Sequence, residues 1–249
     1  AIWSRHTVTG NLRTSDLSFK PVNDLILAAL PPTLELAILS LLLVVVVAIP
    51  MGLVLAQGRD RWWARPLSGL VTLGISVPGF WVGLLLIVLF SVTFKLLPSG
   101  GYIAPARSLS GNARAMVLPV LTLAIYLIPA LVRFVRVTAA TVLREDYVDT
   151  ARAKGVGNAG ILLRHVAPNT LITTITYIGL QLGVLISGAI VVEIIFSIPG
   201  LGRLGMNAVL NRDYPVIQGV VLVAAAGYVI VNLAIDLAYS MIDPRIRTR

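Results

Sequence analysis

The chain has 249 residues, of which 57% are hydrophobic and only 12% are charged. Soluble domains carry roughly 25% charged residues, so this composition excludes an ordinary soluble protein and indicates an integral membrane protein. The formal net charge of +9 does not indicate a nucleic-acid partner, because the arginines lie in short loops between apolar segments, where they set orientation. With no cysteine and two widely separated histidines, we expect neither a disulfide framework nor a metal site.

Five segments are apolar over about the 20 residues that a membrane-spanning helix needs. They are residues 33–56, 69–94, 115–137, 169–195 and 217–241. The first is rich in β-branched residues, but an isolated strand would leave its backbone groups unsatisfied in lipid, so a helix is expected there too. Four prolines within these segments are expected to kink the helices, and they are Pro50, Pro78, Pro119 and Pro129.

The segments predict an all-α, polytopic membrane protein. Residues 1–249 are interpreted as a single transmembrane domain, with residues 1–32 as an outer N-terminal segment. Twelve of the twenty Lys and Arg residues lie in or beside alternate loops, which the positive-inside rule places in the cytoplasm: Arg59, Arg61, Arg65, Arg144, Arg152, Lys154, Arg164, Arg245, Arg247 and Arg249, with Arg133 and Arg136 just inside the preceding helix end. The N-terminal segment is then outside and does not resemble a signal peptide, so we expect one earlier span and six spans in the intact protein.

A polar stretch from residue 144 to residue 166 interrupts the apolar sequence and reads REDYVDTARAKGVGNAGILLRHV. Residues 141–154 contain neither Gly nor Pro, and acidic residues precede basic ones, which is the order that the helix dipole favours. We therefore predict a short helix there, with Tyr147, Val148 and Ala151 on one apolar face.

The end of this polar stretch is rich in glycine. Gly155 is expected to end the first helix in a left-handed conformation, and a second helix over 160–166 is expected to end near Pro168. From the physical pattern alone, two interpretations remain open. The segment is either an amphipathic element lying on lipid headgroups or a helical projection into the cytoplasm.

The same stretch resembles a known motif. Asp149, Thr150 and Ala151, followed after three residues by Gly155 and later by Pro168, resemble the EAA motif of ATP-binding-cassette (ABC) importer permeases. The letters DYVDTARAKG look like the version found in dipeptide and oligopeptide permeases. Further segments are similar, in the same order, to the B-type permease of that family: SVPGFWVGLLLIVLF (76–90), KLLPSGGY (95–102), EIIFSIPGLGRL (193–204), RDYPVIQG (212–219) and DPRIR (243–247).

The resemblance implies a type I ABC importer fold and a coupling helix within residues 144–166 that docks into a partner ATPase. The implied contact residues are Glu145, Asp146, Tyr147, Asp149, Thr150, Ala151, Arg152, Ala153, Lys154 and Gly155. The chain has no Walker A lysine motif, so we do not expect it to hydrolyse ATP or to hold a cofactor. ATP and Mg²⁺ are expected on the partner ATPase subunits.

The resemblance further implies a permease subunit of a binding-protein-dependent importer of dipeptides or oligopeptides, working by alternating access in the bacterial cytoplasmic (inner) membrane. Expected partners are a second, homologous permease subunit, cytoplasmic ATP-binding subunits, an extracytoplasmic substrate-binding protein and membrane lipid. No nucleic acid is expected.

Three acidic residues, Glu35, Glu193 and Asp236, lie in or beside apolar segments. Because a charge at mid-bilayer costs about 2.5–3.5 kcal/mol on insertion scales, each needs a partner or a role. For Glu35 and Glu193 we favour interfacial solvation or pairing with an arginine or a backbone amide. Glu193 is also a candidate for the translocation pathway or for holding the outer turn.

Residues 198–205 have the spacing G-x-G-x-x-G, but no strand precedes them and they are predicted outside, which excludes a dinucleotide site. The resemblance implies instead an outer re-entrant turn that helps line the translocation path. Its candidate residues are Glu193, Pro199, Gly200 and Gly202.

Two alternative functions remain open. One is a permease of the same family for nickel or another small solute such as haem, although no cluster of His or Cys in the spans favours a metal. The other is a secondary transporter without an ATPase. It would need a paired acid–base relay inside the spans, and the sequence shows no convincing trace of one.

Overall fold

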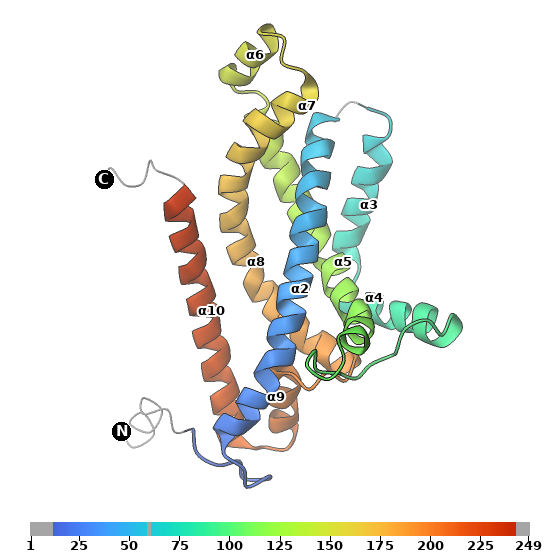
Figure 1. Ribbon diagram of the computed structural model, residues 1–249, viewed down its shortest axis with the longest axis vertical. Helices are drawn as coiled ribbons and strands as arrows, with labels where there is room; N and C mark the ends of the chain where they lie inside the picture. The colour runs from blue at the N-terminus through green and yellow to red at the C-terminus, as the bar shows by residue number, and fades with distance from the viewer. Residues whose placement is uncertain (1–11, 59–60, 243–249) are drawn as a thin grey trace. The chain divides into compact units, whose positions relative to one another are not determined.

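The computed structural model describes residues 12–58 and 61–242, with only the backbone for residues 235, 236 and 238–242. These residues form helices, with no strand beyond one isolated bridge between Thr14 and Pro21. The predicted all-α class is confirmed. In chain order (Figure 1), the elements are α2 (Val22–Gln57), α3 (Ala64–Ser76), α4 (Gly79–Leu86), η1 (Ile87–Thr93), α5 (Leu109–Val142), α6 (Asp146–Ala153), α7 (Asn158–Ile161), η2 (Leu162–Val166), α8 (Ala167–Ile195), α9 (Leu201–Leu210) and α10 (Tyr214–Ile242).

Four described helical stretches are long and apolar enough to cross a membrane, which confirms the polytopic prediction. They are Val22–Gln57, Leu109–Val142, Asn158–Ile195 and Tyr214–Ala234. The first begins at Val22, well before the apolar run that starts at residue 33.

The second predicted span, 69–94, is not one continuous helix. Its two halves, Ala64–Ser76 and Gly79–Thr93, are bent by 103° at a short break, and the pair counts as a fifth span only if it crosses as a unit. Pro78 lies at the break, has no N–H to donate and disfavours helical backbone at Val77, which is extended. α2 and α5 continue through the other three predicted kink sites.

The chain divides into two compact units. Among the described residues, the first unit holds 12–40, 79–123 and 185–229, and the second holds 41–58, 61–78, 124–184 and 230–242. Each unit contains one part of each of the helices α2, α5, α8 and α10. The interpretation of the whole chain as one transmembrane domain stays a prediction.

The first unit packs around two hydrophobic clusters. One includes the fully buried Leu36, Leu118, Phe196 and Ile198, so it joins α2 and α5 to the turn after α8. The other joins the start of α2 to α9 and α10 and consists of the buried residues Val22, Ile26, Ala29, Leu201, Ala208 and Val216. These clusters fix the position of the turn that precedes α9.

The second unit is held by close contacts between helices. A Cβ placed on Gly52 of α2 would lie 2.6 Å from Cβ of Val135 in α5, so the two backbones approach closely there. The rings of Phe134 and Tyr177 stack between α5 and α8 with their centroids 4.1 Å apart. These contacts position the end of α5, from which the polar segment continues.

The orientation can be tested with reporter fusions. A reporter at Gly58, between α2 and α3, and one after Arg249 should both be cytoplasmic, whereas one at Ser110, near the start of α5, should be external. The basic residues at 59, 245, 247 and 249 and the motif at 243–247 lie outside the described residues. An external signal at Gly58 would overturn the orientation; the predicted sixth span stays a prediction.

Candidate functional site

The polar segment begins with a turn and then a separate helix. α5 ends at Val142 and α6 begins at Asp146, so the prediction of one helix over 141–154 is wrong in its first part. Glu145 has extended backbone, with φ of −74° and ψ of 142°, and precedes the first helical residue. Asp146 and Asp149 occupy the first turn of α6, where the helix dipole favours negative charge, which explains why a new helix starts here.

The other end of α6 is closed by glycine. Gly155 has a φ of +82°, the left-handed conformation predicted for it. Its N–H donates to the carbonyl of Arg152 at 2.9 Å, and the N–H of Val156 donates to the carbonyl of Ala151 at 3.1 Å. These two bonds form a Schellman motif, which satisfies carbonyls at the end of the helix. The chain therefore leaves α6 in a defined direction.

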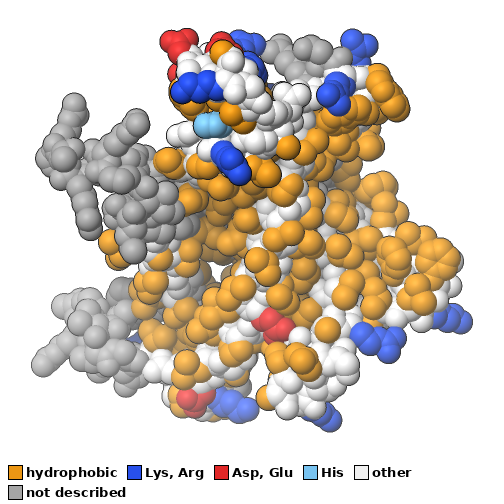
Figure 2. Space-filling view, turned by 45° about the horizontal axis from the view of Figure 1, so that its top comes forward, with side chains coloured by type: hydrophobic (Ala, Val, Ile, Leu, Met, Phe, Trp, Pro, Cys, Tyr) orange, Lys and Arg blue, Asp and Glu red, His pale blue; other side chains and the backbone are white. Residues whose placement is uncertain are grey.

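α6 turns its small apolar residues inward. Val148 is fully buried and Ala151 is 6% exposed. Among the ten predicted contact residues, Ala151 alone is buried, and the exposed ones are Glu145, Asp146, Tyr147, Asp149, Thr150, Arg152, Ala153, Lys154 and Gly155. Figure 2 shows acidic and basic side chains gathered at the end of the unit that carries α6. The exposed face of this short helix is therefore polar and carries both charge signs.

Tyr147 does not share the buried face, so the prediction of a three-residue apolar face is wrong at this position. Its side chain is 42% exposed. Its hydroxyl accepts a hydrogen bond of 3.1 Å from the amide of Asn169 near the start of α8. Burial raises the pKa of Tyr147, and the charge of Glu145 adds to this, while the Asn169 bond lowers it. The phenol therefore stays neutral and links α6 to α8.

An ion pair lies on the exposed face of α6. Nη1 of Arg152 is 2.7 Å from Oδ1 of Asp149, one turn earlier. Both side chains are about half exposed or more, at 48% and 66%, so water screens the pair. Such surface pairs contribute about 0–1 kcal/mol. The pair therefore orders the exposed face more than it stabilises the fold.

The return from α6 is a helix that does not stop at Pro168. α7, η2 and α8 run on from Asn158 to Ile195, so the predicted helix end near Pro168 is wrong. The turn just before Pro168, Leu162–Val166, is π-helical, and this wider turn accommodates a residue without an N–H. The amide of Gln57 at the end of α2 donates to the carbonyl of Asn158 at 2.8 Å, which fixes the start of this helix.

In the first unit, Glu193 holds the start of α9. Its carboxyl is fully buried; Oε1 accepts from Oγ1 of Thr33 at 2.6 Å and Oε2 accepts from the N–H of Arg203 at 3.0 Å. Thr33 Oγ1 also accepts from the N–H of Leu201 at 2.8 Å. The carboxylate and the hydroxyl therefore satisfy N–H groups at the amino end of α9, where the helix dipole favours an anion.

The glycines of the outer turn make room for this carboxylate. A Cβ on Gly200 would overlap the carboxyl group of Glu193, and a Cβ on Gly202 would lie 2.6 Å from Cα of Ile190. Pro199 is exposed beside them. The structure thus brings together Glu193, Gly200 and Gly202 as a buried cap, which agrees with pairing to backbone amides. Their role in the translocation pathway stays a prediction.

Two hydrogen-bond partners of the acidic residues, Thr33 and Tyr102, could not be predicted from the sequence. Thr33 gives no signal, because nothing near it in the chain indicates a contact with Glu193. Among the described residues, Glu35 pairs with neither an arginine nor an amide; it accepts from the hydroxyl of Tyr102 at 2.7 Å. Burial, followed by this bond, raises the pKa of Tyr102 to about 12, so the phenol stays a donor. The side chain of Asp236 lies outside the described residues.

Among the side chains that the structure describes, no set of three or more His, Asp or Glu is placed to hold a metal ion.

Comparison with known proteins identifies similar chains. A family model described as "Binding-protein-dependent transport system inner membrane component" matches residues 48–248. The glutathione transport system permease protein GsiC of Salmonella choleraesuis (strain SC-B67) is 40% identical over 97% of this chain and 76% of its own. A Brucella abortus (strain 2308) protein with the provisional name of peptide transport system permease is 40% identical over 95% of this chain and 76% of its own.

Solved structures share the fold. An inward-facing structure of the MetNI methionine ABC transporter contains a chain that matches 88% of this one, over 96% of its own length, with a TM-score of 0.74 and 17% identity. A chain of an amino acid ABC transporter matches 90% of this one, over 94% of its own length, with a TM-score of 0.60 and 18% identity. At these identities the likeness concerns the fold alone, and it confirms the predicted fold of an ABC importer permease.

Proposed function

The chain belongs to the family of binding-protein-dependent transport system inner membrane components, and from this membership we propose that it is one of two permease subunits of an ATP-driven importer of short peptides. Membership and the spanning helices make it a multi-pass permease of the inner membrane. The substrate, the partner subunits and the role of α6 are the proposed part.

The peptide substrate is supported by the names of the relatives. GsiC is named for glutathione, a tripeptide, and the Brucella relative for peptides. Both align over more than nine tenths of this chain. A nickel or haem permease remains the second candidate within the family, and uptake measurements distinguish it from the first.

The observation that carries the coupling role is the orientation of α6. Its small apolar residues Val148 and Ala151 are buried, so they are not available to insert into a lipid surface. The exposed face instead carries Asp149, Arg152 and Lys154. A polar face of mixed charge on a helix with a defined end suits a protein partner better than lipid headgroups. We therefore assign this face to a cytoplasmic ATP-binding subunit.

The chain around α6 is suited to pass on a movement. Three residues separate α6 from α5, and a short turn after Gly155 leads to α7 and the long helix that follows. A displacement of α6 would therefore move the ends of two spanning helices together. ATP and Mg²⁺ would be held by the partner subunits, whose closure would shift the permease pair between inward-open and outward-open states. An extracytoplasmic binding protein would deliver the peptide from outside.

The proposal can be tested by reconstituting the complete transporter in proteoliposomes, with ATP and Mg²⁺ inside and the binding protein and a labelled tripeptide outside. Uptake should require ATP and should be inhibited by unlabelled di- and tripeptides. A complex whose ATPase subunit binds but cannot hydrolyse ATP is the control. Uptake driven by an ion gradient without ATP would favour a secondary transporter, and nickel uptake without peptide uptake would favour the second candidate.

A further inference from the structure

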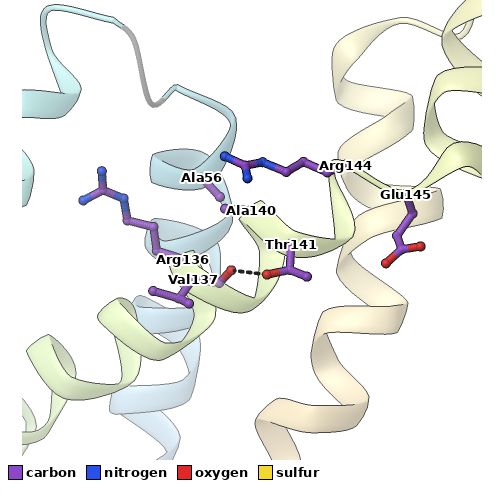
Figure 3. A pocket seen from close by; sticks show the side chains of 7 residues that line it. All are labelled: Ala56, Arg136, Val137, Ala140, Thr141, Arg144 and Glu145. Carbon is purple, nitrogen blue, oxygen red and sulfur yellow. Dashed lines mark hydrogen bonds between the residues drawn. The ribbon is translucent and has the colours of Figure 1, made fainter.

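Two adjoining pockets lie in the second unit between α2, α3 and α5. The larger, of about 500 Å³, is shown in Figure 3; the smaller has about 330 Å³. Both are lined by Arg136 and Val137, so they form one continuous feature, here called the arginine pocket. Of the ten predicted ATPase-contact residues only Glu145 lines it, and the outer turn takes no part in it. Neither the family membership nor the proposed coupling role explains its three arginines.

The arginine pocket is strongly cationic. Arg133 and Arg136 line the smaller part, and Arg136 and Arg144 line the larger part. Figure 3 shows the side chains of Arg136 and Arg144 extending to the same side of α5, whereas the carboxylate of Glu145 points away from them. Among the described residues, no carboxylate forms an ion pair with any of these three guanidinium groups. Glu145 also lines the larger part, so the three guanidinium groups leave the pocket with an excess of positive charge.

One of these arginines is already oriented. Nη1 of Arg136 donates to Oγ of Ser68 at 2.8 Å, and this hydroxyl in turn donates to the carbonyl of Ala64 at 2.6 Å. A guanidinium group has five N–H donors, so most of its donors are left for a ligand. Thr72 and Thr141 also line the pocket, but each donates its hydroxyl hydrogen to a backbone carbonyl, so the guanidinium groups are the donors for a ligand. A phosphate group matches this set, because its oxygens accept several charge-assisted hydrogen bonds at once.

The other walls of the arginine pocket are apolar and lie where the apolar part of the helices ends. Ala56, Val71 and Val137 are among the lining residues. In α5 the uncharged run that follows Arg114 ends at Val132, directly before Arg133. Trp62, in the turn between α2 and α3, is 83% exposed, and tryptophan is enriched at the level of lipid headgroups. The pocket thus combines cations with an apolar wall at headgroup level.

We propose that the arginine pocket binds the phosphate headgroup of an anionic phospholipid, with Arg136 and Arg144 as its principal contacts and acyl chains lying along the apolar wall. Basic pockets between spanning helices on the cytoplasmic side are suited to anionic headgroups. Because Arg144 lies two residues before α6, a bound lipid would hold the end of the helix that leads into the polar segment. This site is independent of the transported substrate.

The test is native mass spectrometry of the purified full-length protein titrated with phosphatidylglycerol, with phosphatidylcholine as the neutral lipid. Each basic residue near an anionic surface contributes about a fivefold gain in binding, so Arg136→Gln and Arg144→Gln should each weaken phosphatidylglycerol binding about fivefold and the double variant about 30-fold. Arg114→Gln is the charge-matched control. It lies at the other end of α5, where its guanidinium donates to the carbonyl of Leu96.

The alternatives give different results. Unchanged lipid binding in the double variant, or equal binding of both lipids, would overturn the proposal. Displacement of phosphatidylglycerol by millimolar inorganic phosphate would indicate a site for a free anion. If the double variant, purified with its partner subunits, loses the ATPase subunit while phosphatidylglycerol binding is intact, the proposal is overturned and the arginines contact an acidic protein surface instead. Should the double variant aggregate, phosphatidylglycerol binding by Arg144→Gln tests the proposal instead. Arg144 is exposed, so its replacement leaves the contacts between the helices intact.

Discussion

Replacing Gly155 by valine is expected to abolish peptide uptake and to detach the ATPase subunit, while the permease still inserts in the membrane. With its φ of +82°, Gly155 occupies a conformation that costs a residue with a side chain about 1–2 kcal/mol, and a β-branched one more. Valine would therefore break the two hydrogen bonds that close α6 and redirect the chain. No atom lies within 4 Å of a Cβ added at Gly155, so the penalty comes from the backbone conformation and not from a clash. Alanine should therefore be less harmful than the β-branched valine. Co-purification of the ATPase and peptide-stimulated ATP hydrolysis measure the effect.

Gly157→Val is the matched control. Gly157 also has open space around its Cβ position, but its φ is −66°, which any residue adopts. Asp149→Ala should also be mild, since it removes one exposed ion pair. Normal ATPase binding and hydrolysis in Gly155→Val would refute the coupling role, whereas an equal loss in Gly157→Val would show that any side chain in this turn is harmful.

Glu193→Ala should destabilise the permease severely. The substitution leaves the N–H of Arg203 without its acceptor beside a fully buried position, and the Thr33 hydroxyl keeps only its longer bond, to the carbonyl of Ala29 at 3.3 Å. Each buried donor left without an acceptor costs about 1–3 kcal/mol, and the space left by the side chain adds to this cost. Gly200→Ala should have a similar effect, because its methyl group would displace the same carboxylate. Thermal unfolding followed by size-exclusion chromatography of the detergent-solubilised protein measures both.

Two variants separate the cap from general sensitivity. Glu193→Gln keeps the shape and one acceptor, so it should leave assembly intact while it alters transport. Gly69→Ala should be neutral or slightly stabilising, since no atom lies within 4 Å of its added Cβ in α3. Wild-type thermal stability of Gly200→Ala would contradict the cap. Wild-type uptake by Glu193→Gln would limit that residue to a structural role.

The sequence predicted well those features that depend on local pattern. Apolar runs predicted the helices, and the glycine at 155 predicted a left-handed helix end, because each follows from the physical properties of neighbouring residues. The break at Pro78 was expected as a kink, but its size, 103°, depends on packing that no single segment contains. Pro168 was misread as a helix end because a π-helical turn accommodates it.

The contacts of the acidic residues could not be predicted in the same way. Glu193 was identified as a buried acid that needs a partner, yet Thr33 is 160 positions away in the chain. Likewise, Tyr102 gives no sequence signal of its contact with Glu35. The arginine pocket was also missed, because the positive-inside rule accounts for its arginines without requiring that they share a cavity.

Site-directed cross-linking tests the central claim, that α6 contacts the ATP-binding subunit, most directly. The chain has no cysteine, so Ala153→Cys places a single thiol on the exposed face of α6. In the intact complex, a short thiol-to-amine cross-linker should join this residue to the ATP-binding subunit, with a yield that changes on ATP binding. The control, Ser110→Cys near the start of α5, should give no such adduct. Absence of the adduct from Ala153→Cys, or equal yields from both positions, would contradict the proposed coupling function.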